Sequence, residues 1–164
     1  MFMNFWNQQK NIFNRSHVTL IKMLKSIAEV VANHQPKGFN NSLHWNVGHI
    51  LTINEQLLFL LPNHPTEFPL HYIELFGQGT KPTEFQENVP SLETLIDQLI
   101  DQKTRVEELA VQGFDLKLTE PLLLEPLSLE TNGELFNFAI YHQGEHTGFI
   151  NALKNIVEIA EVQN

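Results

Sequence analysis

Hydrophobic residues recur with a helical period in four stretches of the chain. In residues 5–34 the apolar positions are spaced by seven, four, three and four residues, at Phe13, Leu20, Leu24, Ile27 and Val31. The same spacing of three and four residues recurs in residues 42–61, 92–109 and 133–161. Side chains at that spacing lie on one face of a helix, so the pattern predicts four long helices that each bury one face.

Residues that break or cap helices lie between these stretches. Pro36 and Gly38 follow the first stretch, and Asn41 or Ser42 is the predicted N-cap of the second. Ser91, directly after a proline, opens the third. These residues set the expected starts of the second and third helices.

The two longest connections differ in composition. Residues 62–90 hold five of the eight prolines, which predicts a loop with one short helical turn around residues 69–76. Residues 114–132 alternate weakly between apolar and polar side chains. This second connection is predicted to be extended, with a short hairpin as one form of it, before Thr131 or Asn132 caps the fourth helix.

Four long helices joined by long connections predict an all-α protein, a four-helix bundle with crossover connections rather than a simple up-and-down order. A length of 164 residues suits a single domain over residues 1–164. Hydrophobic residues make up 42% of the chain, which favours a soluble folded protein over disorder. The longest apolar runs, such as residues 57–61, are far too short to cross a membrane. No signal peptide is recognised at the N-terminus, so a cytoplasmic location is expected.

Charge and cysteine content narrow the candidate chemistry. The chain has no cysteine, so disulfides and thiolate metal ligands are excluded and a metal must be held by His, Asp or Glu. Its formal net charge is −9, from 10 Lys and Arg against 19 Asp and Glu. Lys22 and Lys25 form the densest basic group on a predicted helix, too little to neutralise nucleic-acid phosphates. A small-molecule substrate is therefore expected, and neither nucleic acid nor membrane is expected as a partner.

His142 and His146 are the strongest candidates for chemistry. They lie four residues apart in the stretch YHQGEH, so on a helix they share one face, and the residues above and below them on that face are apolar. Both imidazoles should therefore point into the bundle, with Tyr141 as a packing neighbour. Two interpretations stay open, namely two buried histidines satisfied by hydrogen bonds or two ligands of one metal ion.

His49 is the best candidate for a third ligand, which would favour the metal site. It follows Trp45 by four residues and precedes Ile53 by four, on the inward stripe of the second helix. His44 is rotated by about 140° from His49 on the helical wheel, so the two are not expected to point inward together. Three histidines from two facing helices would leave coordination positions open for water or substrate.

Residues 142–146 also match the H-x-x-E-H pattern of inverted zinc peptidases, in which Glu145 would be the general base. That reading is disfavoured, because such peptidases carry a further carboxylate ligand well downstream and only 18 residues follow His146. Glu145 is then either a solvated carboxylate at the rim of the site or a catalytic acid–base group near the metal.

Two segments together resemble the DinB-like (YfiT-like) family of metal-dependent proteins. They are SLHWNVGHIL, which carries Trp45 and His49, and NGELFNFAIYHQGEHTGFI, which carries His142 and His146. The resemblance extends over essentially the whole chain. It implies a four-helix bundle with crossover topology, a divalent metal, zinc or nickel, on His49, His142 and His146, and a homodimer.

The family includes enzymes that depend on a low-molecular-weight thiol, in which the metal activates the thiol for transfer to a small electrophile. That activity is our leading expectation from the resemblance. The alternatives are a metal-dependent hydrolase that uses metal-bound hydroxide with help from Glu145, and a non-catalytic stress-related binding protein. After the second histidine the family often reads Arg-Gly-Gln, whereas this chain has Thr147, Gly148 and Phe149.

Overall fold

The computed structural model describes residues 2–84 and 88–162. Four long helices make up most of it: α1 (Phe2–Leu24), α3 (Leu43–Glu55), α5 (Leu92–Glu108) and α6 (Asn132–Val162). Shorter elements are α2 (Glu29–Asn33), α4 (Tyr72–Phe76) and the hairpin of β1 (Lys117–Leu124) and β2 (Leu127–Thr131). The predicted all-α class is confirmed, with a two-stranded sheet as the one β element of the described residues.

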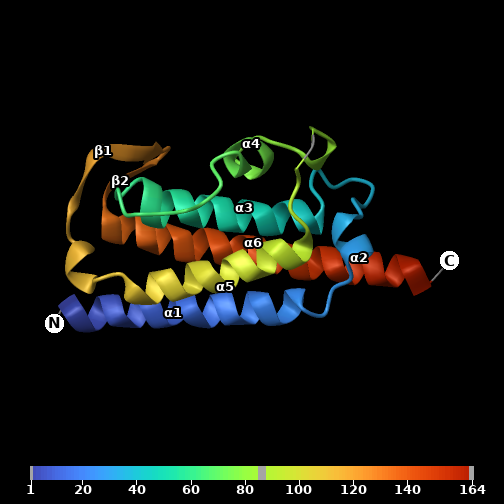
Figure 1. Ribbon diagram of the computed structural model, residues 1–164, viewed down its shortest axis with the longest axis horizontal. Coiled ribbons are helices and arrows are strands. Elements are labelled where there is room, and N and C mark those ends of the chain that lie inside the picture. Colours follow the sequence, from blue (N-terminus) through green and yellow to red (C-terminus); the bar gives the residue numbers. More distant parts are fainter. Residues whose placement is uncertain (1, 85–87, 163–164) are drawn as a thin grey trace.

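The bundle has crossover connections, as predicted. Helix α1 packs against α5 and α6, and α3 packs against the same two helices, so α1 lies diagonally opposite α3 and α5 lies diagonally opposite α6. Figure 1 shows α3 and α5 running in the same direction, which forces residues 61–91 to return along the bundle. Helix α6 then runs antiparallel to α3, and this pair carries the candidate site.

The first helix is shorter than predicted. One helix over residues 5–34 is wrong, because α1 ends at Leu24 and α2 is separate. The backbone N–H groups of Ser26 and Ile27 donate to carbonyls only three residues back, and this tighter turn ends the α-helix. Ile27 and Val31 are both buried, so the apolar spacing continues across the break and conceals it.

The second helix begins and ends as predicted but changes its winding. The Ser42 hydroxyl accepts a hydrogen bond from the backbone N–H of Trp45 at 3.1 Å, which is the expected N-cap. After Glu55 the helix continues as a π-helical turn over Gln56–Leu60, in which the Leu61 N–H donates to the Gln56 carbonyl five residues back. Such wide turns are frequent at functional sites, and this one lines the pocket described below.

The connections also follow the prediction. A short helix, α4, falls within the expected turn of residues 69–76, and residues 117–131 form the hairpin with Leu124 opposite Leu127 at its end. Thr131 caps α6, since its hydroxyl accepts from the Glu134 N–H and Glu134 accepts from the Thr131 N–H.

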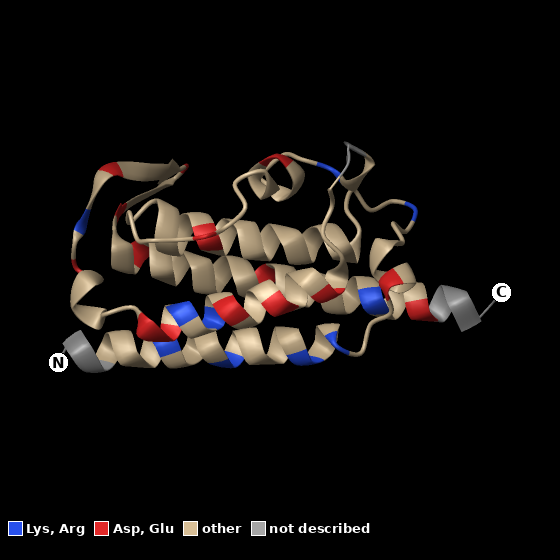
Figure 2. Cartoon of the chain, viewed as in Figure 1, with Lys and Arg blue, Asp and Glu red and all other residues tan. Residues whose placement is uncertain are grey.

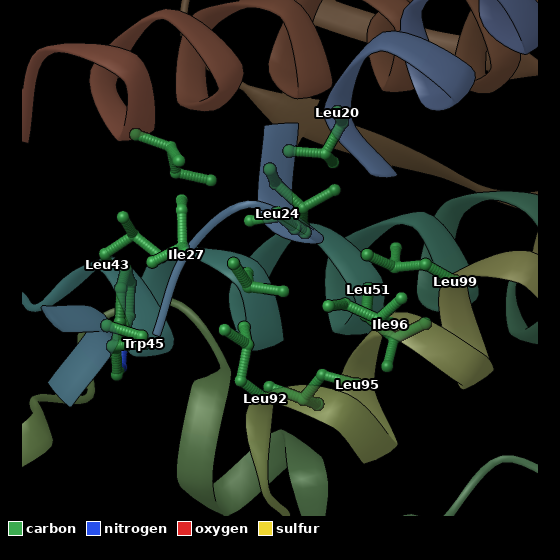
Figure 3. Close-up of a cluster of buried hydrophobic side chains, with 14 of the residues drawn as sticks. Leu20, Leu24, Ile27, Leu43, Trp45, Leu51, Leu92, Leu95, Ile96 and Leu99 are labelled. Atoms are coloured by element: carbon green, nitrogen blue, oxygen red, sulfur yellow. The ribbon is translucent and has the colours of Figure 1, made fainter. Parts of the chain in front are cut away.

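Apolar side chains from all four helices fill the interior. Figure 3 shows part of this core, where leucines of α1, α3 and α5 point toward one another. Two clusters of buried residues divide α6, and α3 with the turn that follows it: Ile50 and Ile150 belong to one cluster, Leu57 and Ala139 to the other. The candidate histidines lie on α3 and α6 between these two clusters.

Charged residues lie mainly on the outer faces. Figure 2 shows acidic and basic residues side by side along α5, where Lys103 pairs with Glu107 and Arg105 with Asp101. Arg105 also binds the fully buried Glu55 carboxylate through two nitrogens, at 2.8 and 3.0 Å, and so ties the end of α3 to α5. Among the described residues, no helix is long and apolar enough to cross a membrane.

Candidate metal centre

His49, His142 and His146 converge between α3 and α6. One ring nitrogen from each lies within 4.8 Å of those of the other two. The Nε2 atoms of His49 and His142 are 3.1 Å apart, and both side chains are buried, while His146 is half-buried. The three candidates of the sequence analysis are therefore brought together at one place.

Helix geometry explains the convergence. His142 and His146 are one turn apart on α6, and their ring centroids are 4.5 Å apart. His49 faces them from α3, with its ring centroid 4.7 Å from that of His146. Trp45, one turn before His49, stacks on it at 4.5 Å with an angle of 15° between the rings. The indole thus fixes the plane of the His49 ring.

A backbone carbonyl fixes the tautomer of His49. Its Nδ1–H donates to the carbonyl oxygen of Phe76, at the end of α4, over 2.6 Å. Because a carbonyl oxygen only accepts, the proton is on Nδ1 and the lone pair of Nε2 points into the cluster. A Cβ atom at Gly48 would overlap the Phe76 ring, so glycine at this position lets α4 approach His49.

The side chain of Asn46 fixes the tautomer of His146. The Asn46 amide nitrogen donates to the Ser42 carbonyl at 2.8 Å, which orients the amide and turns its oxygen toward His146. That oxygen accepts from His146 Nδ1–H, also at 2.8 Å. His146 is therefore protonated on Nδ1, and its Nε2 keeps a lone pair.

His142 differs from the other two because its Nδ1 atom is buried and has no hydrogen-bond partner among the described residues. Its Nε2 faces the lone pair of His49 Nε2. If Nε2 carried the proton and donated to His49, the lone pair of Nδ1 would have no donor. His142 is thus the ring whose hydrogen bonding the protein alone leaves incomplete, and its Nδ1 is the one histidine nitrogen among the seven buried side-chain atoms of the described residues that have no partner.

All three imidazoles are held in the neutral form. Burial lowers the pKa of His49 to about 4, against the Phe76 carbonyl, which raises it. Burial, together with the neighbouring His146 and His49, lowers the pKa of His142 to about 3. Burial also lowers the pKa of His146. Metal ligation requires unprotonated imidazole nitrogens, so the cluster is in the correct state at neutral pH.

The residues present fit a divalent cation. Hydrogen bonds at Nδ1 leave the Nε2 lone pairs of His49 and His146 available, Nε2 of His142 lies 3.1 Å from Nε2 of His49, and Nδ1 of His142 has no partner. Imidazole suits zinc, nickel, copper and iron, and three protein ligands leave positions open for a small molecule. The arrangement could therefore hold a metal ion and present it to a substrate.

A pocket of about 550 Å³ lies beside two of the histidines. The end of α3, the π-helical turn, the end of α4, strand β1 and α6 form its walls. Its lining residues are His49, Ile53, Gln56, Leu57, Leu60, Leu61, Ile73, Gly77, Gln78, Leu122, Leu124, Phe138 and His142. A larger cavity, about 670 Å³, lies between α5 and residues 65–69 and includes none of the three histidines.

The structure leaves Glu145 outside the cluster. Its side chain is exposed on α6 and forms no hydrogen bond with another described residue. This position agrees with the reading of a solvated carboxylate, and a catalytic role remains a prediction. Tyr141 is 62% exposed, so the expectation that it is a packing neighbour is wrong for most of its surface, although its ring lies 6.0 Å from that of Phe138.

The expectation for His44 is also wrong. Both His44 and His49 are buried, although the helical wheel turns them apart. The reason is that α3 is covered on nearly all sides: His44 Nε2 lies 2.8 Å from the Pro90 carbonyl, next to the start of α5. A buried helix can bury polar residues on several faces when each has a partner.

The residues that orient His49 and His146 by hydrogen bonds, Phe76 and Asn46, were not predicted from the sequence. Asn46 precedes His49 by three residues, so its place on a neighbouring face was readable from the spacing. The carbonyl of Phe76 left no signal, because any residue supplies a carbonyl and only the fold brings α4 to His49. Gly48 could be explained only after the Phe76 ring was located.

Comparisons with known proteins agree with this fold. Residues 12–150 match the family model described as the DinB superfamily. A solved structure described as the conserved protein of locus from Enterococcus faecalis is 16% identical, with a TM-score of 0.61, covering 92% of this chain and 95% of that one. At that identity the likeness concerns the fold alone. No curated protein matches the chain. The match over residues 12–150 shows that the chain belongs to the DinB superfamily.

Proposed function

We propose that this protein is a metal-dependent enzyme that activates a low-molecular-weight thiol for transfer to a small electrophile, with a divalent cation, zinc or nickel, on His49, His142 and His146. The main support for the proposal is that three neutral imidazoles converge at one place and that an apolar pocket lies next to them. A site that only stabilised the fold would need no pocket beside it.

A bound divalent cation would supply one effect, a lowered pKa of a thiol that reaches an open position, and hence a thiolate at neutral pH. The three histidines would hold the ion, and Trp45, Asn46 and the Phe76 carbonyl orient the histidines. In the transfer, the sulfur lone pair forms a bond to the electrophilic carbon. The leaving group departs with the electron pair of the broken bond, and the thiol proton passes to solvent.

The apolar walls contribute by position and by excluding water. Leucines from the π-helical turn and from β1 flank the histidines, so a ligand held there would lose part of its hydration. Orientation of the ligand next to the open coordination positions would raise the effective concentration of the reacting groups.

The first experiment is metal analysis of freshly purified protein, followed by a spectral titration of the nickel-loaded protein with benzyl mercaptan. We expect about one ion per chain and a new near-ultraviolet charge-transfer band on adding the thiol. Absence of metal, with no uptake of added zinc or nickel, would contradict the proposal. Hydrolysis of an ester or amide probe that is lost in Glu145→Gln would support the hydrolase reading in its place.

The proposal includes a homodimer, as the family resemblance implies. It is supported by exposed apolar side chains on α6, where Tyr141, Phe149 and Ile156 are 62%, 39% and 39% exposed. Light scattering should then give about twice the 18.9 kDa of one chain. A mass of one chain at micromolar concentration would contradict this part of the proposal.

A further inference from the structure

The pocket beside His49 and His142 has no charged wall. None of its described lining residues is Asp, Glu, Lys or Arg, and its only ionisable side chains are the two histidines of the candidate centre. The residues outside the described part of the chain include no lysine or arginine either. A ligand with a carboxylate, phosphate or ammonium group in the body of this pocket would therefore lose hydration without meeting a described residue of opposite charge.

Hydrocarbon forms most of the surface that a ligand would meet. Leu57 and Leu60 come from the π-helical turn, Leu122 and Leu124 from β1, and Phe138 from α6. The alternation of the strand explains why β1 can serve this wall: Leu122 and Leu124 face the pocket, while Leu123 between them is 69% exposed.

Two uncharged polar groups interrupt the hydrocarbon. Gln56 begins the π-helical turn and Gln78 follows α4, and neither side-chain amide has a hydrogen bond to another described residue. Each amide offers both a donor and an acceptor. They suit a carbonyl, amide or hydroxyl group of a ligand, and they cannot neutralise a charge.

We infer that the pocket selects an uncharged small molecule with a mainly hydrocarbon body and one neutral polar group near Gln56 and Gln78. The inference rests on the proposed function where it places the thiol group of the ligand at the histidines. Its statement on the charge and polarity of the ligand rests only on the residues that line the pocket. Thiols that carry several carboxylate or ammonium groups are accordingly poor ligands of this pocket.

Three matched thiols test the selection in cobalt-loaded protein: benzyl mercaptan, 4-(mercaptomethyl)benzamide and 4-(mercaptomethyl)benzoate. Binding is measured as the change in visible and near-ultraviolet absorption. We expect the benzamide to bind at least as tightly as benzyl mercaptan and the benzoate at least about 30-fold more weakly, a difference of about 2 kcal/mol. A benzoate affinity within about threefold of the benzamide would overturn the inference.

Charge-adding variants give the reverse test. Gln78→Arg and Leu124→Arg place a cation at the pocket and should recover benzoate binding by about tenfold or more. Leu123→Arg is the matched control, because it adds the same charge to the same strand on its exposed side and should recover nothing. Gln78 is exposed, so Gln78→Arg remains a valid test if Leu124→Arg does not fold. Equal recovery in Leu123→Arg would overturn the inference.

Metal-free protein separates this inference from the proposed function. Ligand-observed NMR compares 4-methylbenzamide with 4-methylbenzoate, which have neither thiol nor metal requirement. Stronger binding of the benzamide supports the inference even if no thiol alters the cobalt spectrum, an outcome that would contradict thiol activation alone. Equal binding of the two would overturn the inference whatever the thiols do.

Discussion

Within the same bundle, the buried His17 and the cluster of His49, His142 and His146 differ in what their ring nitrogens face. His17 is fully buried, and each of its ring nitrogens faces a protein oxygen, Oε1 of Gln143 at 2.8 Å and the Leu99 carbonyl oxygen at 2.9 Å. In the cluster of His49, His142 and His146, nitrogens instead point at one another, and Nδ1 of His142 has no partner. Burial alone therefore does not mark a site. A candidate site is marked instead by imidazole nitrogens that converge, one ring of which has a nitrogen with no hydrogen-bond partner in the protein.

Removing the cluster should have the largest effect. Replacing His49, His142 and His146 together with alanine should reduce bound metal from about one ion per chain to none, because no other group of three or more metal-binding side chains lies close together in the described residues. Elemental analysis after gel filtration measures this. His71→Ala is the control, since His71 is exposed, and should keep its metal. If the triple variant retained its metal, the cluster would not be the metal site, and it would not differ from His17 in function.

Lowering the pH should reduce the free energy of unfolding of the metal-free protein, because the cluster is neutral in the folded state. The pKa values of His49 and His142 are lowered to about 4 and about 3, so the unfolded chain binds protons that the folded one does not. The free energy of unfolding therefore has its full value above about pH 6.5, and it falls as the pH drops toward the pKa values of about 4 and about 3 in the folded protein. Between pH 7.5 and 5 the loss should be on the order of 2 kcal/mol for each histidine.

Urea denaturation of the wild type and the triple alanine variant at both pH values isolates this effect, because His17 and His44, whose pKa values burial also lowers, are present in both. Equal pH dependence in the two proteins would show that the cluster is not held neutral.

His17→Ala should affect folding and leave the metal in place. It removes one of the hydrogen-bond partners of the Gln143 side chain and the side-chain contact of the Leu99 carbonyl inside the bundle. The free energy of unfolding should fall by about 1–3 kcal/mol, while metal stoichiometry stays the same. Thermal unfolding and elemental analysis measure the two properties. Loss of metal with little loss of stability would place His17 with the cluster.

Gly48→Ala should weaken metal binding without touching a ligand. The added methyl group would collide with the Phe76 ring, displace α4 and lengthen the hydrogen bond from His49 Nδ1 to the Phe76 carbonyl. Loss of such an orienting bond costs about 10- to 100-fold in metal affinity. Competition with a metal chelator measures the affinity. Gly144→Ala on α6 is the matched control, because its methyl group meets nothing within 4 Å.

Glu145→Gln should have the smallest effect. The carboxylate is exposed and forms no hydrogen bond with the described residues, so metal affinity and thiol binding should change by less than about twofold. The titrations described above measure both. A large loss of turnover with unchanged metal affinity would assign Glu145 an acid–base role and favour the hydrolase alternative.

The sequence predicted the parts of the fold that depend on local pattern. The helical spacing located α3, α5 and α6, and Ser42 and the cluster of prolines in residues 62–90 marked the boundaries around α3. It failed at the end of α1, where buried Ile27 and Val31 continue the apolar spacing through a turn. The π-helical winding of Gln56–Leu60 also left no pattern, since its residues remain apolar on the core side.

The candidate site divides in the same way. Its three histidines were predictable because two share a helix face and the third follows Trp45 by one turn. Their orientation was not predictable, because it depends on the Phe76 carbonyl and on the oxygen of Asn46, which only tertiary structure brings to the rings. The pocket depends on the hairpin, whose position over α3 and α6 no local spacing encodes.

We propose above that His49, His142 and His146 together hold one divalent cation. Anomalous diffraction at the absorption edge of the metal, from crystals of zinc- or nickel-loaded protein, tests it most directly. We predict one strong peak per chain, about 2.0–2.2 Å from one nitrogen of each of the three rings. A peak bound by only one of these histidines, or by residues elsewhere on the chain, would contradict the account.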